Sequence, residues 1–142
     1  RVVACNGDLD IPNIRRPLQR QLLKAWTRTI EDHYDLCLLN SERSLQASFW
    51  THIVDELPKN RRTFIEPLIK KHYGPAIPRI FPDILVCNSQ TVIAVIEIKY
   101  TPQKPPQFTK DIQTLNWVAK NRARLYVENN RFQGDASETE VY

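Results

Sequence analysis

Residues 91–100 constrain the fold most, because this run is apolar on both faces of any strand that it forms. Every residue from Val92 to Ile96 is apolar, whereas a strand with one face in water alternates apolar and polar side chains. The run Thr91–Tyr100 therefore predicts a central strand that is covered on both sides. We expect an α/β fold, with a mixed central sheet flanked by helices.

Three segments show the spacing of apolar side chains that is typical of helices covering a core. The first runs from Pro17 to His33, with the proline as first helical residue. The second starts after Asn40 or Ser41, both good caps, and stops at Pro58. Thr109 can cap the third. The apolar stripes are Leu18, Leu22, Trp26 and Ile30; Leu45, Phe49, Ile53 and Leu57; and Ile112, Leu115 and Val118 or Ala119, with Arg122.

Further strands are expected around the central one. They are Arg62–Ile69, broken late by Pro67, Ile80–Cys87, and a short last strand over Leu125–Glu128. Asn88-Ser89 makes a tight connection between the second of these and the central strand. Asp35–Leu39 is expected to be an apolar loop plug or a brief strand. Residues 1–12 and 134–142 show no periodicity and are expected to be loosely ordered.

The length of 142 residues fits a single domain, residues 1–142. No stretch of 18 apolar residues occurs, which predicts no membrane-spanning helix. Arg1–Asp10 lacks the apolar region of a secretion signal. Cys5, Cys37 and Cys87 are odd in number and too far apart for a CxxC site. These features together predict a cytoplasmic protein with reduced thiols.

The basic residues, which give a net charge of +4, are clustered along the chain. One cluster lies on the first predicted helix and another follows the central strand, and acids are scarce in both. Such segments suit a phosphate backbone, although lysines and arginines also commonly just solvate helix faces. The residues predicted to contact nucleic acid are Arg15, Arg16, Arg20, Lys24, Lys104 and Lys110. The first helix could instead help to form a homodimer.

Charged side chains interrupt the two most apolar strands. Asp83 lies among apolar neighbours in the Ile80–Cys87 strand, and Glu97 and Lys99 end the central strand. Because strand side chains alternate, Glu97 and Lys99 share one face about 6.6 Å apart, with Ile98 on the other. An ionised carboxylate there costs several kcal/mol to desolvate unless something compensates. Taken alone, an exposed Glu–Lys pair at a strand end would explain Glu97 and Lys99.

Asp83 favours a functional interpretation over that simple pair. A hairpin through Asn88-Ser89-Gln90 would put Asp83 opposite Val95, and a bulge of one or two residues would bring it beside Glu97. Two carboxylates that close repel each other, and Lys99 neutralises only one. A divalent cation such as Mg²⁺ or Mn²⁺ would resolve this, since Mg²⁺ takes carboxylates, waters and substrate phosphate as ligands. Lys99 would then face the phosphate and the attacking water, and would not balance the carboxylates.

Glu42 is a further candidate. It precedes Leu45 by three residues and so continues the apolar stripe of the second helix toward the sheet. An acid there could reach the same metal, or it could simply be a favourable first-turn residue. Gln46, one turn later, is a polar partner at the same level.

Pro82-Asp83 followed by Glu97-Ile98-Lys99 resembles the PD-(D/E)xK motif of the restriction-endonuclease-like nucleases. The predicted order helix, strand, strand, strand, helix, strand from Ser41 to Glu128 is similar to the αβββαβ core of that superfamily, here with an extra N-terminal helix. The resemblance implies a metal held by Asp83, Glu97, the main-chain carbonyl of Ile98 and a helix acid matching Glu42. It also implies that Lys99 positions water or stabilises the transition state, which makes Asp83, Glu97 and Lys99 the catalytic set.

The sequence therefore predicts a metal-dependent nuclease that hydrolyses phosphodiester bonds of DNA or RNA. Metal and lysine are needed because an anionic nucleophile attacks an anionic centre. One alternative is a non-catalytic nucleic-acid- or nucleotide-binding module on the same fold. Another is a protein-interaction scaffold with no polynucleotide ligand.

Several reactive or aromatic residues are given no catalytic role. The histidines share no metal-ligand spacing, and we expect surface or helix-end positions for them. Cys37 and Cys87 lie in apolar runs and are expected to be buried and inert. Trp50 and Trp117 are expected to pack rather than to stack on bases. The histidines in question are His33, His52 and His72.

Overall fold

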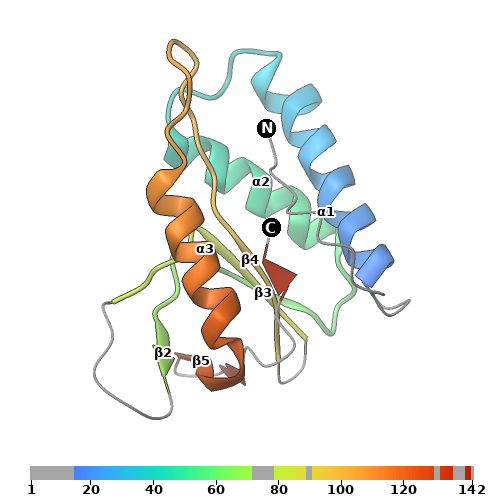
Figure 1. Cartoon of the computed structure of the whole chain (residues 1–142). Coiled ribbons are helices and arrows are strands. Elements are labelled where there is room, and N and C mark those ends of the chain that lie inside the picture. The colour runs from blue at the N-terminus through green and yellow to red at the C-terminus, as the bar shows by residue number, and fades with distance from the viewer. Residues whose placement is uncertain (1–14, 72–78, 89–90, 130–131, 136–139, 142) are drawn as a thin grey trace.

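The computed structural model describes residues 15–71, 79–88, 91–129, 132–135 and 140–141. Within these ranges the chain is a mixed α/β fold (Figure 1). The helical elements are α1 (Arg15–Thr29), the π-turn η1 (Ile30–Tyr34), α2 (Glu42–Glu56), α3 (Thr109–Asn121) and the 3₁₀ turn η2 (Arg122–Arg124). The strands are β1 (Arg62–Ile65), β2 (Ile69–Lys71), β3 (Ile84–Cys87), β4 (Val92–Ile96), β5 (Leu125–Asn129), β6 (Phe132–Asp135) and β7 (Glu140–Val141).

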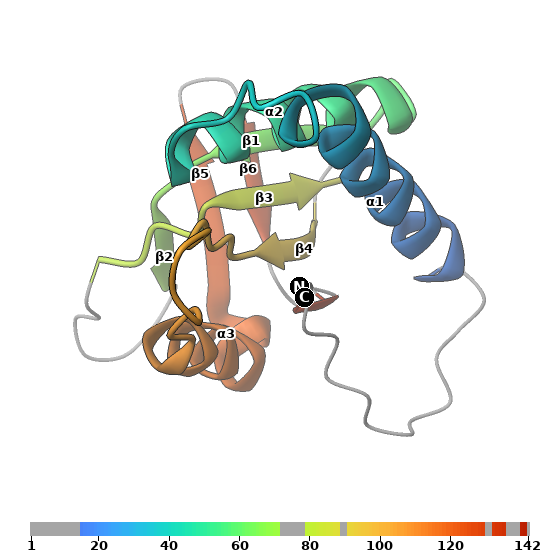
Figure 2. The ribbon, with the colours of Figure 1, turned by 90° about the horizontal axis from the view of Figure 1, so that it is seen from above.

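The strands form two sheets. The central sheet has the order β1-β3-β4-β7, in which β1, β3 and β4 are antiparallel and β7 runs parallel to β4. It is therefore a mixed sheet, as the sequence predicts. The second sheet has the order β2-β5-β6 and is antiparallel. Figure 2 shows α1 and α2 on one face of the central sheet and α3 on the other.

Alternation along β3 explains why both faces of the sheet are covered. Ile84 and Val86 are fully buried in a core with α1 and α2, whereas Leu85 and Cys87 are fully buried in a second core. In that second core they pack with Val118 of α3 and Leu125 of β5. The same holds for β4, for which the sequence predicts burial on both faces: Ala94 and Ile96 lie in the first core, and Val92 and Val95 in the second.

The expected strand Arg62–Ile69 does not form as one element. β1 ends at Ile65, and the chain turns at Glu66, whose φ of 47° is left-handed, immediately before Pro67. This turn directs β2 into the second sheet. Among the described residues, four strands therefore lie between α2 and α3 where the sequence predicted three.

The end of the chain also differs from the prediction. The last predicted strand is confirmed as β5, but it pairs with β2 and β6 and not with the central sheet. Gly134 and Asp135 belong to β6, and Glu140–Val141 forms β7, so part of the segment expected to be loosely ordered is regular. The expected loose arm at residues 1–12 lies outside the described residues.

The N-terminal helix begins and ends differently from its prediction. It starts at Arg15, so Pro17 is its third residue, and it continues as the π-turn η1 to Tyr34. The loop that follows does not act as a plug. Leu36 and Leu38 are both 63% exposed, and Cys37 is exposed with a φ of 57°. Among the described residues, no helix is long and apolar enough to cross a membrane.

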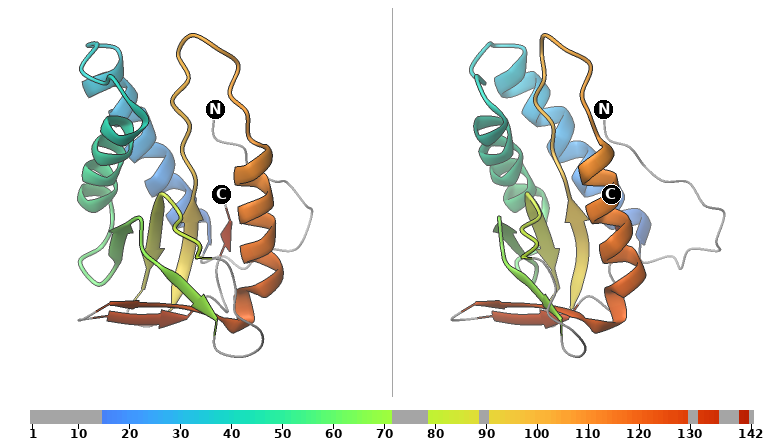
Figure 3. Two further views of the ribbon diagram at one scale, coloured as in Figure 1. Left: turned by 90° about the vertical axis from the view of Figure 1, so that its left-hand side faces the viewer. Right: turned by 60° about the vertical axis from the view of Figure 1, so that its left-hand side comes forward.

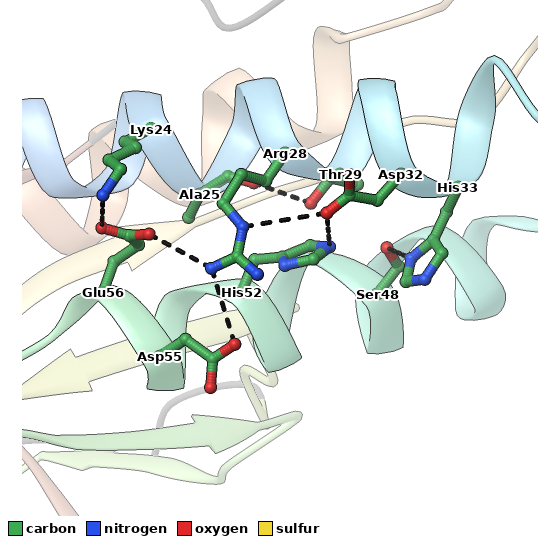
Figure 4. Close-up of polar contacts among 10 residues, drawn as sticks. All are labelled: Lys24, Ala25, Arg28, Thr29, Asp32, His33, Ser48, His52, Asp55 and Glu56. Carbon is green, nitrogen blue, oxygen red and sulfur yellow. Dashed lines mark hydrogen bonds and ion pairs between the residues drawn. The ribbon is translucent and has the colours of Figure 1, made fainter.

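An ion-pair network fastens α1 to α2 (Figure 4). Lys24 Nζ lies 2.9 Å from Glu56 Oε2, and Arg28 Nη1 lies 3.2 Å from Glu56 Oε1 and 3.5 Å from Asp55 Oδ2. These contacts lower the pKa of Glu56 chiefly through its hydrogen bond with Lys24. The basic stripe of α1 is thus partly used in holding the two helices together.

His52 is buried inside this network, which corrects its expected surface position. Its ring lies 5.2 Å from that of His33, whose Nδ1 is 2.6 Å from Ser48 Oγ. Neither ring nitrogen of His52 has a hydrogen-bond partner among the described residues. Burial, followed by the positive charge of Arg28, lowers the pKa of His52, which keeps the ring neutral at neutral pH. His72 lies outside the described residues.

Candidate functional site

A cavity of about 580 Å³ lies where β4 ends and where α2 and α3 begin. α2 and α3 approach it from opposite faces of the central sheet (Figure 3). The two helix N-termini therefore meet at one end of the sheet, where their dipoles favour negative charge. The ionisable side chains in the cavity wall include Glu42, Asp83, Glu97, Lys99, Lys110 and Asp111.

The β3–β4 hairpin brings Asp83 to Glu97. Ile84 pairs with Ile96 and Leu85 with Val95, so Asp83 immediately precedes β3 at the position where Glu97 follows β4. The predicted register, with Asp83 opposite Val95, is two residues off. The register shifts between Val86 and Cys87, and this irregularity is of the kind expected to align the two acids.

β4 is also shorter than predicted, since it ends at Ile96 and leaves Glu97–Tyr100 without regular structure. The alternation of side chains nevertheless continues. Ile98 is 3% exposed and packs in the core beneath α1 and α2, whereas Glu97 and Lys99 line the cavity on the other side. This separation of Ile98 from its neighbours is the arrangement that the sequence predicts.

Asp83 is held firmly. Its Oδ2 accepts a hydrogen bond of 2.5 Å from the backbone N–H of Ile98. The side-chain amide of Gln46 donates to the Asp83 backbone carbonyl at 2.9 Å and approaches Oδ1 at 3.5 Å. Gln46 is only 4% exposed, so a buried amide of α2 fixes the position of this acid. Its expected role as a polar partner at the site is consistent with these contacts.

Asp83 and Glu97 are hydrogen-bonded to each other, and both resist ionisation. Burial, followed by the charges of Asp83 and Asp111, raises the pKa of Glu97 to about 8. Burial is also the main cause that raises the pKa of Asp83, and the N–H of Ile98 opposes it. At neutral pH the pair therefore shares a proton that ordinary carboxyl groups would have lost.

Lys99 lies beside the pair, and two other acids hold its ammonium group. Its Nζ lies 3.2 Å from Asp111 Oδ1 and 3.5 Å from Glu42 Oε1. Burial alone would lower the pKa of Lys99, but the hydrogen bond to Asp111 and the negative charge of Glu42 outweigh it and raise the pKa. Lys99 is therefore charged. The sequence did not anticipate these partners, since it predicted that Lys99 faces the phosphate and the attacking water and does not balance carboxylates.

Glu42 reaches the cavity from the first residue of α2. Ser41 caps this helix, its Oγ accepting from the Ser44 N–H at 3.1 Å, and Ser44 Oγ in turn accepts from the Ser41 N–H at 3.0 Å. The second oxygen of Glu42 accepts from the backbone N–H of Tyr100 at 3.1 Å. The carboxylate of Glu42 thus joins α2 to the segment after β4, and the role of Glu42 as a metal ligand stays a prediction.

Asp111 is named from the sequence only as a possible accessory residue of the third predicted helix, with no motif to give it a role, and the structure places it in the cavity wall. It lies in the first turn of α3 and is 8% exposed. One oxygen holds Lys99, and the other, Oδ2, is buried without a hydrogen-bond partner among the described residues. The sequence placed Ile112 on the buried stripe of this helix. In the structure the side chain of Ile112 is 44% exposed. α3 begins after Phe108 as its cap, not after Thr109.

The donor atoms fit a hard divalent cation with two protein carboxylates. Asp83 and Glu97 offer oxygen ligands, and their repulsion is the property that a cation relieves. In the part of the chain that the structure describes, no group of three or more His, Cys, Asp or Glu side chains could hold a metal. Mg²⁺ commonly needs only one or two carboxylates, with waters and substrate phosphates as its other ligands. A Mg²⁺ or Mn²⁺ site at Asp83 and Glu97 therefore stays a prediction.

The predicted nucleic-acid contacts are not all near the cavity. Lys110 lines it, whereas Arg20 and Lys104 are exposed side chains outside its lining, and Lys24 is paired with Glu56. Arg15 and Arg16 lie at the start of α1, and their side chains are outside the described part.

The predictions for the described cysteines and tryptophans are confirmed except at Cys37. Cys87 is buried, and burial raises its thiol pKa to about 12, which makes it unreactive as expected. Cys37 is exposed, so its predicted burial is wrong. Trp50 and Trp117 both pack against the cores, as expected, but Trp117 also lines the cavity.

Comparisons with protein-family models, with curated proteins and with solved structures find no match to this chain.

Proposed function

We propose that this protein is a divalent-metal-dependent nuclease that hydrolyses phosphodiester bonds of DNA or RNA. The observation that carries the proposal is that Asp83 and Glu97 lie side by side in a cavity wall that also holds the charged Lys99. Burial and the repulsion between the two acids oppose their ionisation. Buried acids and bases with strongly shifted pKa values in one cavity are typical of catalytic sites. The resemblance of these residues to the PD-(D/E)xK motif supports the same assignment.

Each side chain has a definite task in the proposed site. Asp83 and Glu97 would hold Mg²⁺ or Mn²⁺, which when bound supplies positive charge and an acidified water. The N–H of Ile98 and the amide of Gln46 orient Asp83. The Ile98 carbonyl and Glu42 stay the further ligands predicted from the sequence.

Lys99 supplies the charge that the reaction requires from the protein. An anion that attacks a phosphodiester builds negative charge on the phosphate oxygens, and an ammonium group beside them offsets it. Glu42 and Asp111 hold Lys99 from two sides, at 3.5 and 3.2 Å, and so restrict where its Nζ can lie. Such fixed positioning lowers the reorganisation needed during the reaction.

A second candidate is a nucleic-acid-binding module on the same fold that does not cleave. The contacts of Lys99 favour it, because an ammonium group that already has two acidic partners is less available to a phosphate. This candidate predicts binding that weakens as salt rises, without Mg²⁺-dependent products.

Incubation of the protein with labelled single- and double-stranded DNA and RNA tests the proposal. We expect shorter products with Mg²⁺ or Mn²⁺ and none with EDTA. Asp83→Asn, purified in parallel, is the control for contaminating nucleases, since asparagine keeps an oxygen for the Ile98 N–H but removes the carboxylate. Intact substrates under every condition, or equal cleavage by Asp83→Asn, would contradict the assignment.

A further inference from the structure

Two of the residues that line the cavity are aromatic. They are Phe81, from the segment before β3, and Trp117, from α3. Phe81 is 50% exposed, whereas Trp117 is partly buried and packs on the core. Aromatic residues from two separate elements therefore border the space that Asp83 and Glu97 also line.

The exposure of Phe81 is imposed by its neighbours. Ile80 packs on the core and its carbonyl accepts from the Ile69 N–H at 2.9 Å, while the side chain of Pro82 is fully buried. The Asp83 carbonyl accepts from the Glu66 N–H at 3.1 Å. With residues on both sides anchored, the backbone at Phe81 is held at the cavity, which reduces the entropy lost when a ligand packs against this residue.

Aromatic rings at this place suit an unpaired base. In a duplex the faces of the bases are covered by their neighbours, and the backbone offers only sugars and phosphates to a protein. An unpaired base exposes a face that stacks on aromatic side chains, and this stacking tolerates any sequence. A volume of about 580 Å³ is within the range of sites that hold one small ligand, such as a nucleoside.

Cations lie beside the rings. Arg79 precedes the Ile80-Phe81 pair, and Lys110 lies in the first turn of α3; both are exposed and both line the cavity. Basic groups next to stacking aromatics are the combination that binds single-stranded nucleic acids. Arg79 is two residues from Phe81 in the chain, and Lys110 lies on the same helix as Trp117.

We propose that the cavity takes an unpaired segment of a polynucleotide, one base of which lies against Phe81 and Trp117. The phosphates beside that base lie against Arg79 and Lys110. This inference rests on the proposed function for the presence of a phosphodiester bond at Asp83 and Glu97. It adds to that function a preference for single strands or for nucleotides displaced from a duplex.

Fluorescence anisotropy with labelled 12-nucleotide probes tests the preference in EDTA, where metal-dependent cleavage cannot occur. The probes are one sequence as single-stranded DNA, as single-stranded RNA and as the DNA duplex. We expect at least one single-stranded probe to bind about tenfold or more tightly than the duplex, and the tighter of the two identifies the sugar. Phe81→Ala should weaken single-strand binding by about tenfold and leave duplex binding unchanged.

Leu36→Ala is the matched control, because it removes an exposed apolar side chain outside the cavity lining. It should bind like the wild type. Trp117→Phe keeps a ring on the core and should weaken single-strand binding less than Phe81→Ala. Thermal unfolding confirms that each variant folds.

The two proposals fail separately. If single strands bind in a Phe81-dependent way but are not cleaved in Mg²⁺, the nuclease assignment is wrong. The proposal that the cavity binds an unpaired polynucleotide segment would still stand. Equal affinity for duplex and single strands, or a Phe81→Ala affinity within twofold of the wild type, would overturn the inference even if the protein cleaves DNA or RNA.

Discussion

Lys99→Ala is expected to reduce Mg²⁺-dependent cleavage by at least 100-fold, with the loss in kcat rather than in KM. Removing one donor that stabilises charge in a transition state typically costs about 10²–10³ in rate. Lys99 is the cation bonded to Asp111 and Glu42 in the cavity wall, so its ammonium group has a fixed position beside the paired acids. Single-turnover cleavage at saturating substrate measures the change.

Folding has to be separated from chemistry in this experiment. Lys99→Ala leaves Asp111, which is 8% exposed, without its cation, and this costs stability. Lys99→Met keeps the aliphatic stem and should be equally inactive. Lys59→Ala, an exposed lysine in the loop after α2, should cleave like the wild type. A folded Lys99 variant with kcat within tenfold of the wild type would remove Lys99 from the mechanism.

Glu97→Gln is expected to stabilise the metal-free protein at pH 8, although it disables the site. The pKa of Glu97 is about 8 in the folded protein and about 4.5 in the unfolded chain. The folded state therefore keeps a proton that the unfolded chain releases between these values. The stability that this proton provides is complete below pH 4.5 and is lost as the pH rises through 8. Glutamine mimics the protonated form at every pH.

The expected gain is about 1–3 kcal/mol at pH 8, and it should vanish near pH 4.5. One pKa unit corresponds to about 1.36 kcal/mol, and the partial exposure of Glu97 reduces the full amount. Urea unfolding in EDTA at pH 5, 6.5 and 8 measures the difference between variant and wild type. The opposite slope that His52 contributes, because its pKa is lowered, cancels in this comparison.

Mg²⁺ completes the test of Glu97. It should stabilise the wild type at pH 8, since it binds the ionised pair, and should have little effect on Glu97→Gln. A difference in unfolding free energy between Glu97→Gln and the wild type that stays constant from pH 5 to 8 would contradict this prediction. It would mean that the pKa of Glu97 is not raised by burial and by Asp83.

The sequence predicts that Asp83 and Glu97 lie side by side, because this proximity depends only on the geometry of one hairpin. Asp83 and Glu97 flank one hairpin, so the error in the predicted register was only two residues, and the shift between Val86 and Cys87 accounts for one of them. The side chain of Ile98 lies in the core, whereas those of Glu97 and Lys99 line the cavity, because side chains go on alternating in direction beyond the last residue of β4.

Asp111 could not be predicted in the same way. It is buried because Lys99, twelve residues earlier and across the cavity, compensates its charge at 3.2 Å. Patterns of apolar spacing assign such a position to the surface and give the buried place to Ile112. The second sheet was missed for a related reason, since the left-handed turn at Glu66 has no glycine or asparagine to announce it.

Asp83 and Glu97 are proposed to hold a divalent cation together. Crystals soaked in Mn²⁺ test this most directly, through anomalous scattering recorded at the manganese edge. We expect one peak within about 2.0–2.3 Å of oxygens from both carboxylates, and no such peak in crystals of Asp83→Asn. Manganese bound elsewhere, or carboxylates that stay hydrogen-bonded to each other at saturating Mn²⁺, would contradict it.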